Sequence, residues 1–214
     1  MSDPAEKFLS KGERLQIEAR IAEAEKRTSG EIVVMVVPSS YHYPLASMIG
    51  SSLLAMLLGI AVALLAGNES LWFFLEVFGL SFIVLHELIK RTPLLKRLFV
   101  TPSDMREEVE EAAINSFYHR NINLTVDHTG ILIYISLFER NVRVIADQGI
   151  NAKVDKLVWQ EIVDTIVQGI KSKGQAAAIG TAVDRCAEIL ATHFSLKAGD
   201  RNELANEVII GRGR

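Results

Sequence analysis

Three aspartates beside predicted strands are the residues whose types and spacing best suit chemistry. Asp127 precedes the apolar run GILIYISL, Asp147 follows the run VRVIA, and Asp155 opens a predicted helix. Adjacent antiparallel strands place the start of one beside the end of the other, so these carboxylates are expected near one end of a sheet. Such oxygen ligands could hold Ca²⁺ or Mg²⁺ for phosphoester hydrolysis. Equally, Asp155 could start its helix, and Asp127 and Asp147 could form turns.

The other reactive residue types give weaker patterns. The sequence has no P-loop, no CxxxxxR motif and no HExxH motif. Glu139 and Arg140 lie in a short turn and are expected to close a hairpin at the opposite sheet end, and His128 is expected to be a solvated loop residue. The single cysteine, Cys186, lies between apolar helix positions, which predicts a buried, inert thiol and excludes an intrachain disulfide.

The elements that would position these side chains alternate between helix and strand. Ser10 and Glu13 form a capping box for a helix to about Arg27, whose predicted apolar face contains Leu15, Ile17, Ile21, Ala22 and Ala24. The run EIVVMVV that follows suits a central strand that is covered on both faces. A central strand needs neighbours, and these are found only after residue 100.

The second half of the chain supplies those neighbours. The pattern of residues there predicts a helix starting at Thr101, strands over 131–137 and 142–146, and helices over 154–171 and 175–193. In the helix over 154–171 the residues predicted to point inward are Leu157, Val158, Ile162 and Ile166. The tail ELANEVII either docks on the sheet or stays loose. This order predicts an α/β (α+β layered) sandwich with a mixed sheet of three or four strands and helices on its faces.

Two long apolar runs interrupt this domain. Residues 45–66 carry no charge, and residues 71–89 form a second run that contains Glu76, His86 and Glu87. About 20 apolar residues span the ~30 Å hydrocarbon core of a bilayer, so both runs are predicted to be transmembrane helices. Residues 1–40 and 101–214 must then lie on one side of the membrane as a discontinuous domain. The role of Glu76, near the membrane surface, is left open.

Basic residues predict the orientation of this hairpin. The turn GNES has no lysine or arginine, whereas four basic residues lie in the linker 90–100 directly after the second run: Lys90, Arg91, Lys96 and Arg97. By the positive-inside rule both chain ends are then cytoplasmic, and the linker is expected to lie on anionic lipid headgroups. The net charge of −3 gives no support for nucleic-acid binding.

Small residues recur every fourth position along the first apolar run. They are Ser47, Ser51, Ala55, Gly59, Ala63 and Gly67. Such a stripe allows another helix to approach closely, so it predicts a packing face. The partner is either the second span or the same span of another copy.

Several stretches resemble one family. The TPM domain, also called thylakoid-lumen phosphatase-like, resembles this chain in three stretches: SGEIVVMVVPS, DHTGILIYISLFERNVRVIADQGIN and the later pattern W…IV…I…G…AI…C…IL…HF. In particular, the chain resembles uncharacterised bacterial membrane proteins that carry this domain with a transmembrane insertion. The resemblance implies an α/β sandwich and a bacterial inner-membrane location. Acid phosphatase activity and calcium binding are attributed to plant members, whereas other members are accessory subunits of membrane complexes. Common members are secreted or lumenal with a downstream anchor, and this chain departs from that arrangement.

Two functions from different classes follow. The first is a membrane-anchored, non-catalytic interaction or accessory module at the cytoplasmic membrane face, which engages the bilayer and a membrane complex or another copy through the first span. The second is a Mg²⁺- or Ca²⁺-dependent phosphohydrolase similar to acid phosphatases. The lack of a recognisable catalytic motif favours the first.

Overall fold

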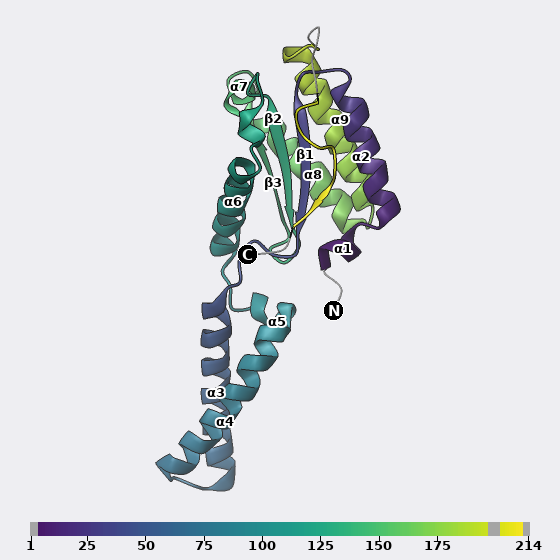
Figure 1. Ribbon diagram of the computed structural model, residues 1–214. Coiled ribbons are helices and arrows are strands. Elements are labelled where there is room, and N and C mark those ends of the chain that lie inside the picture. Colours follow the sequence, from purple (N-terminus) through teal and green to yellow (C-terminus); the bar gives the residue numbers. More distant parts are fainter. Residues whose placement is uncertain (1–3, 197–201, 212–214) are drawn as a thin grey trace. The chain divides into compact units, whose positions relative to one another are not determined.

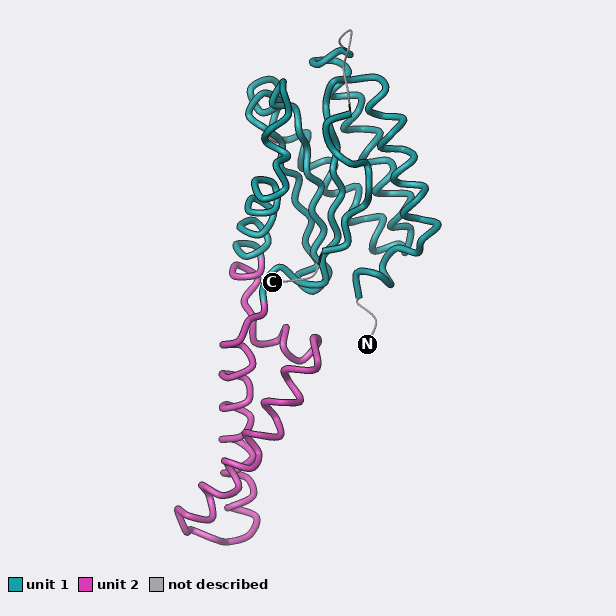
Figure 2. Tube along the Cα trace, viewed as in Figure 1, with its two compact units in different colours: residues 1–41, 106–214 teal, residues 42–105 magenta. Residues whose placement is uncertain are grey.

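The computed structural model describes residues 4–196 and 202–211, and the chain divides into two compact units. Residues 1–41 and 106–214 form one unit, and residues 42–105 form the other (Figure 2). The first unit is built around a β-sheet, and the second is a helical hairpin.

A mixed four-stranded sheet in the order β3-β2-β1-β4 is the centre of the first unit (Figure 1). β1 (Glu31–Val37) runs parallel to β2 (Gly130–Ser136) along its whole length and parallel to the short β4 (Ile209–Ile210), whereas β3 (Asn141–Ala146) is antiparallel to β2. Side chains alternate between the faces of a strand, and all seven residues of β1 are buried. The run EIVVMVV is therefore an interior strand that is covered on both sides.

Helices cover both faces of this sheet (Figure 1). One face packs against α2 (Lys11–Glu25), α8 (Lys156–Lys171) and α9 (Gln175–His193), together with the short α1 (Pro4–Phe8). The other face packs against α6 (Pro102–His119), which contributes Val109, Ala113 and Phe117 to a second apolar cluster. The α/β sandwich with a mixed sheet that the sequence predicts is confirmed.

Side chains at the starts of α2 and α6 cap these helices, as their residue types predict. The Ser10 hydroxyl accepts a hydrogen bond from the Glu13 backbone N–H at 3.3 Å, and a Glu13 carboxylate oxygen accepts one from the Ser10 N–H at 2.8 Å, which completes the capping box. Thr101 accepts a hydrogen bond from Asp104 N–H at 3.2 Å at the start of α6. These bonds satisfy backbone donors that the first helical turn leaves unpaired.

Two helix faces differ from the sequence-based prediction. Leu15 is 65% exposed, whereas Ile17 is buried, because residues two apart lie on nearly opposite sides of a helix. In α8, Leu157 is 72% exposed and Trp159 is buried instead, which gives an inward face with the spacing 159, 162 and 166. In both helices the buried face follows the spacings of three and four that a helix requires.

The second unit is a hairpin of α3 (Pro44–Ala66) and α4 (Leu71–Arg91), followed by the short α5 (Pro93–Arg97). Both long helices are long and apolar enough to cross a membrane. Small residues of α3 face aromatic residues of α4: a Cβ built on Gly59 would lie 3.0 Å from the ring of Phe74. Along α4 the rings of Phe74, Phe78, Phe82 and His86 stack successively.

Candidate functional site

The loops that carry Asp127 and Asp147 meet at one end of the sheet. After the 3₁₀ turn η1 (Ile122–Leu124), His128 places its Nδ1 3.3 Å from an Asp147 carboxylate oxygen. Asp147 also accepts the backbone N–H of Gln148 at 2.7 Å and thereby caps α7 (Gln148–Asn151). Gly149 fits tightly here, since an added Cβ would lie 2.6 Å from the His128 carbonyl oxygen. The site is therefore a closely packed turn around a capping carboxylate.

Asp155, the third predicted metal ligand, caps a helix of its own. Asp155 caps α8 by accepting the Leu157 backbone N–H at 2.8 Å, so its carboxylate serves its own helix. Among the residues that the structure describes, no three His, Cys, Asp or Glu side chains are grouped so that they could hold a metal ion. Asp155 therefore starts its helix, as one of the two interpretations of the sequence predicts, whereas Asp147 caps α7, a role that the sequence does not predict.

Glu139, at the other end of the sheet, is a buried carboxylate. It accepts the Ser40 backbone N–H at 3.1 Å and the Ser39 hydroxyl at 3.1 Å, and the Ser136 hydroxyl donates to it as well. Ser39 and Ser40 directly follow the interior strand β1. Glu139 thus binds the segment by which the chain leaves the sheet, a larger role than the hairpin closure that the sequence predicts.

A pair of carboxyl groups, Glu25 and Glu31, holds the C-terminal segment against the domain. Glu25 accepts the Ile32 backbone N–H at 3.1 Å and the Asn206 side-chain amide at 2.6 Å, and Glu31 accepts the Glu203 backbone N–H at 2.9 Å. The negative charge of Glu31 also acts on the Glu25 carboxyl group. A pocket of about 270 Å³ opens beside them.

The environment of this pair changes its acidity. Burial is the largest cause that raises the pKa of Glu25 to about 7, and the nearby negative charge of Glu31 raises it further. Glu25 is the last residue of α2, where the helix dipole disfavours a negative charge. The raised pKa allows Glu25 to hold or release its proton near neutral pH.

In the hairpin, the small-residue stripe of α3 is used within the same chain. Ser47, Ser51, Ala55 and Gly59 are buried, whereas Ala63 is half-buried and Gly67, the left-handed C-cap residue, is exposed. The Ser51 hydroxyl lies 3.5 Å from His86 Nδ1 of α4. The stripe therefore packs against the second apolar helix.

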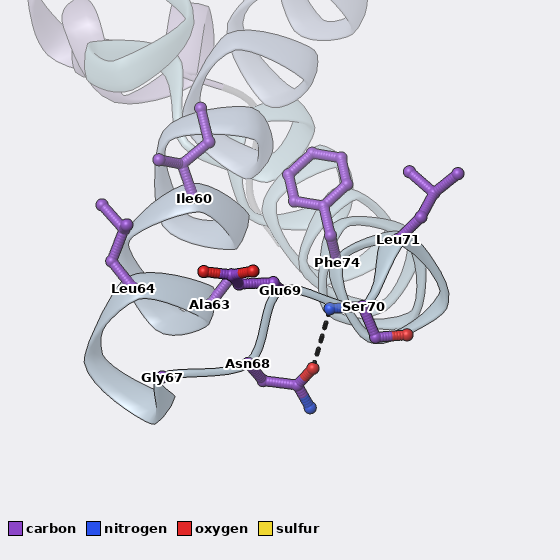
Figure 3. A pocket seen from close by; sticks show the side chains of 9 residues that line it. All are labelled: Ile60, Ala63, Leu64, Gly67, Asn68, Glu69, Ser70, Leu71 and Phe74. Atoms are coloured by element: carbon purple, nitrogen blue, oxygen red, sulfur yellow. Dashed lines mark hydrogen bonds between the residues drawn. The ribbon is translucent and has the colours of Figure 1, made fainter.

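The basic residues after α4 and the tip of the hairpin complete the second unit. Arg91 forms an ion pair with Glu87 at 2.6 Å, Lys90 is exposed, and Lys96 donates to the His42 carbonyl oxygen. At the tip, a pocket of about 460 Å³ lies between the ends of α3 and α4, and Asn68 accepts the Ser70 backbone N–H at 2.9 Å (Figure 3).

Comparison with known proteins identifies the domain. A family model described as the TPM domain matches residues 85–189. The chain carries a TPM domain. The NMR structure of the BA42 protein from the psychrophilic bacterium Bizionia argentinensis has a similar fold, with a TM-score of 0.60 at 20% sequence identity over 95% of this chain and 96% of that chain. No curated protein sequence matches.

The TPM domain match includes the Glu139 and Asp147 sites but neither member of the Glu25–Glu31 pair. The sequence predicts no role for Glu25, although one signal is present: an acidic residue at the end of a helix lies close in sequence to a second acidic residue that opens an apolar strand. The Cys186 thiol is fully buried, and burial raises its pKa to about 12, which makes it unreactive.

The raised pKa of Glu25 predicts a pH-dependent stability. An acid whose pKa is higher in the folded state contributes stability that is present below its unfolded value of 4.5 and is lost as the pH rises through about 7. Glu25→Gln keeps the shape of the side chain but removes the ionisable carboxyl group. We expect thermal unfolding between pH 5 and pH 8 to show a smaller loss of Tm in Glu25→Gln than in the native chain.

Glu23→Gln is the matched control, since Glu23 is an exposed carboxylate on the same helix whose pKa its Lys26 partner lowers. This variant should keep the native loss of Tm over that pH range. Equal pH profiles for the native chain and Glu25→Gln would contradict the assignment.

Proposed function

We propose that this chain is a membrane-anchored TPM-domain protein that acts as a non-catalytic interaction module at the cytoplasmic face of a bacterial inner membrane. The α3–α4 hairpin is its two-pass anchor, and both chain ends are cytoplasmic. Its partners are the lipid bilayer and either a membrane protein complex or another copy of the chain.

The exposed apolar surface of the hairpin carries this proposal. Small side chains of α3 point toward α4, and large apolar side chains point outward, among them Leu57, Leu65, Trp72 and Ile83, which are 57%, 88%, 75% and 67% exposed. Soluble monomers rarely expose apolar patches of more than a few hundred Å². Helices also satisfy their own backbone hydrogen bonds, which a bilayer demands. Both properties support a hairpin whose outer surface contacts lipid.

The distribution of charge supports the orientation. Lys90 and Arg91 end α4, and Lys96 and Arg97 end α5, whereas the opposite turn at residues 67–70 contains Glu69 and no basic residue. Positive charges are retained on the cytoplasmic side of a membrane. Leu94 and Leu98 in the same basic segment are 69% and 75% exposed, which suits an interfacial position on anionic lipids.

The engagement of the polar groups supports a non-catalytic role. Asp147 and Asp155 cap helices, Glu139 binds backbone and hydroxyl groups, and Cys186 is buried. Because the small-residue stripe of α3 is occupied by α4, a partner in the membrane would contact the outward apolar face of the hairpin instead.

Cysteine labelling tests the topology. Asn68→Cys at the hairpin turn should react with a membrane-impermeant maleimide in intact cells. The native Cys186 is fully buried and should give no background. Ala177→Cys, at an exposed position on α9, is the control and should react only after permeabilisation. The reverse pattern, or labelling of both sites in intact cells, would contradict the orientation.

A phosphoester assay tests the non-catalytic role. Purified full-length chain with p-nitrophenyl phosphate and either Mg²⁺ or Ca²⁺ should show no turnover above that of an Asp127→Ala/Asp147→Ala double variant. Metal-stimulated turnover that the double variant loses would instead establish the phosphohydrolase function.

A further inference from the structure

An apolar pocket with a basic rim lies in the sheet-containing unit, beside the β2–β3 turn that carries Glu139. Its volume is about 580 Å³, within the ~300–1,000 Å³ range of small-molecule pockets. It lies between α1, α8 and the β2–β3 turn. Its apolar lining consists mainly of Phe8, Ile135, Leu137, Val142, Val167 and Ile170.

Three cations line the same pocket. Lys7 comes from α1, Arg140 from the β2–β3 turn and Lys171 from the end of α8. All three residues are exposed, and none forms an ion pair with any residue that the structure describes. The described lining contains no carboxylate. Among the described residues, the pocket therefore combines an apolar interior with a positively charged rim.

The wall that α1 provides is held in place. Ala5 and Leu9, within and just after α1, are fully buried, and the Phe8 carbonyl oxygen accepts the Gln175 side-chain amide at 3.1 Å. Arg14 donates to the Leu9 carbonyl oxygen at 3.1 Å. These contacts fix α1 beside the pocket, so the cavity is part of the folded domain.

We propose that this pocket binds a single-chain anionic lipid, with the alkyl chain among the apolar side chains and the carboxylate beside Lys7, Arg140 and Lys171. An inorganic anion would leave the apolar interior unused. A peptide would bring backbone N–H and C=O groups that need partners. Among the described lining residues only Ser136 and Asn141 are polar and uncharged, and the Ser136 hydroxyl already donates to Glu139. An alkyl chain needs no such partner.

This inference goes beyond the anchoring role proposed above and does not require it. The ligand site lies in the sheet-containing unit and is made wholly of its residues. A long-chain carboxylate could reach it from a membrane or from solution.

A photoreactive palmitate with a mid-chain diazirine tests the site in the full-length chain, reconstituted in phosphatidylcholine nanodiscs. After irradiation, mass spectrometry should map crosslinks to peptides that contain Phe8, Val142 and Val167. Excess palmitate should compete for these crosslinks, and hexadecanol, which lacks the charge, should compete far less. Crosslinks to α3 and α4 report separately whether the hairpin contacts lipid, so failure of the anchor and failure of the pocket give different maps.

Two variants probe the two halves of the proposed site. Lys7→Glu/Lys171→Glu changes exposed side chains and should lower pocket labelling about tenfold, since each exposed charge interaction contributes modestly. Val167→Trp should block the cavity itself. Arg106→Glu/Arg120→Glu, which reverses two exposed charges of the α6 region, should leave pocket labelling unchanged.

The proposal fails if pocket peptides are not labelled, whether or not α3 and α4 are. It also fails if the charge-reversed variant labels as strongly as the native chain, or if hexadecanol competes as well as palmitate. Protection of the pocket by a second copy or by another protein, in place of palmitate, would likewise overturn it.

Discussion

The buried carboxylate of Glu139 fixes the point at which the chain leaves its central strand for the apolar hairpin. A buried charge is costly unless it is well hydrogen-bonded, and Glu139 meets this condition by accepting bonds from Ser39, Ser40 and Ser136. Beside it, the Phe138 N–H donates to the Pro38 carbonyl oxygen at 3.0 Å, which extends the β1–β2 pairing into the exit segment. Without this anchor, an interior strand that continues into 60 or so inserted residues would fray at its end.

The chain combines two opposite arrangements of apolar side chains. In the TPM domain the apolar side chains point inward from both faces of a sheet, whereas in the α3–α4 hairpin the small side chains point inward and the large ones point outward. The division between the two patterns falls within the short segment between Val37 and Pro44. Because the first strand lies in the middle of the sheet, the domain cannot be completed until the chain returns from the hairpin and supplies β2, β3 and β4.

Much of this fold could be predicted from the sequence because its signals are local. The capping box at Ser10, the β-branched run of β1 and the uncharged run of α3 each depend on neighbouring residues. Leu15 and Leu157 are exposed although the sequence predicts that they point inward, because packing buries Ile17 and Trp159 instead. The Glu25–Glu31 pair and the basic-rimmed pocket were beyond reach, since each depends on segments that are distant in the sequence. The positions of Asp127 and Asp147 beside the strands follow from the sequence. The roles of Asp147 and Asp155 depend on hydrogen bonds in the folded chain, where each carboxylate caps a helix.

The central claim is that residues on both sides of the hairpin form one domain that holds itself together. The most direct test uses a variant in which a flexible Gly/Ser linker of about 12 residues replaces residues 42–100. Hydrogen exchange is then measured on the purified variant. The account predicts a protein that is soluble without detergent, that unfolds cooperatively, and whose β1 amides are among the slowest to exchange. An aggregated product, or β1 amides that exchange as fast as those of an unfolded chain, would contradict it.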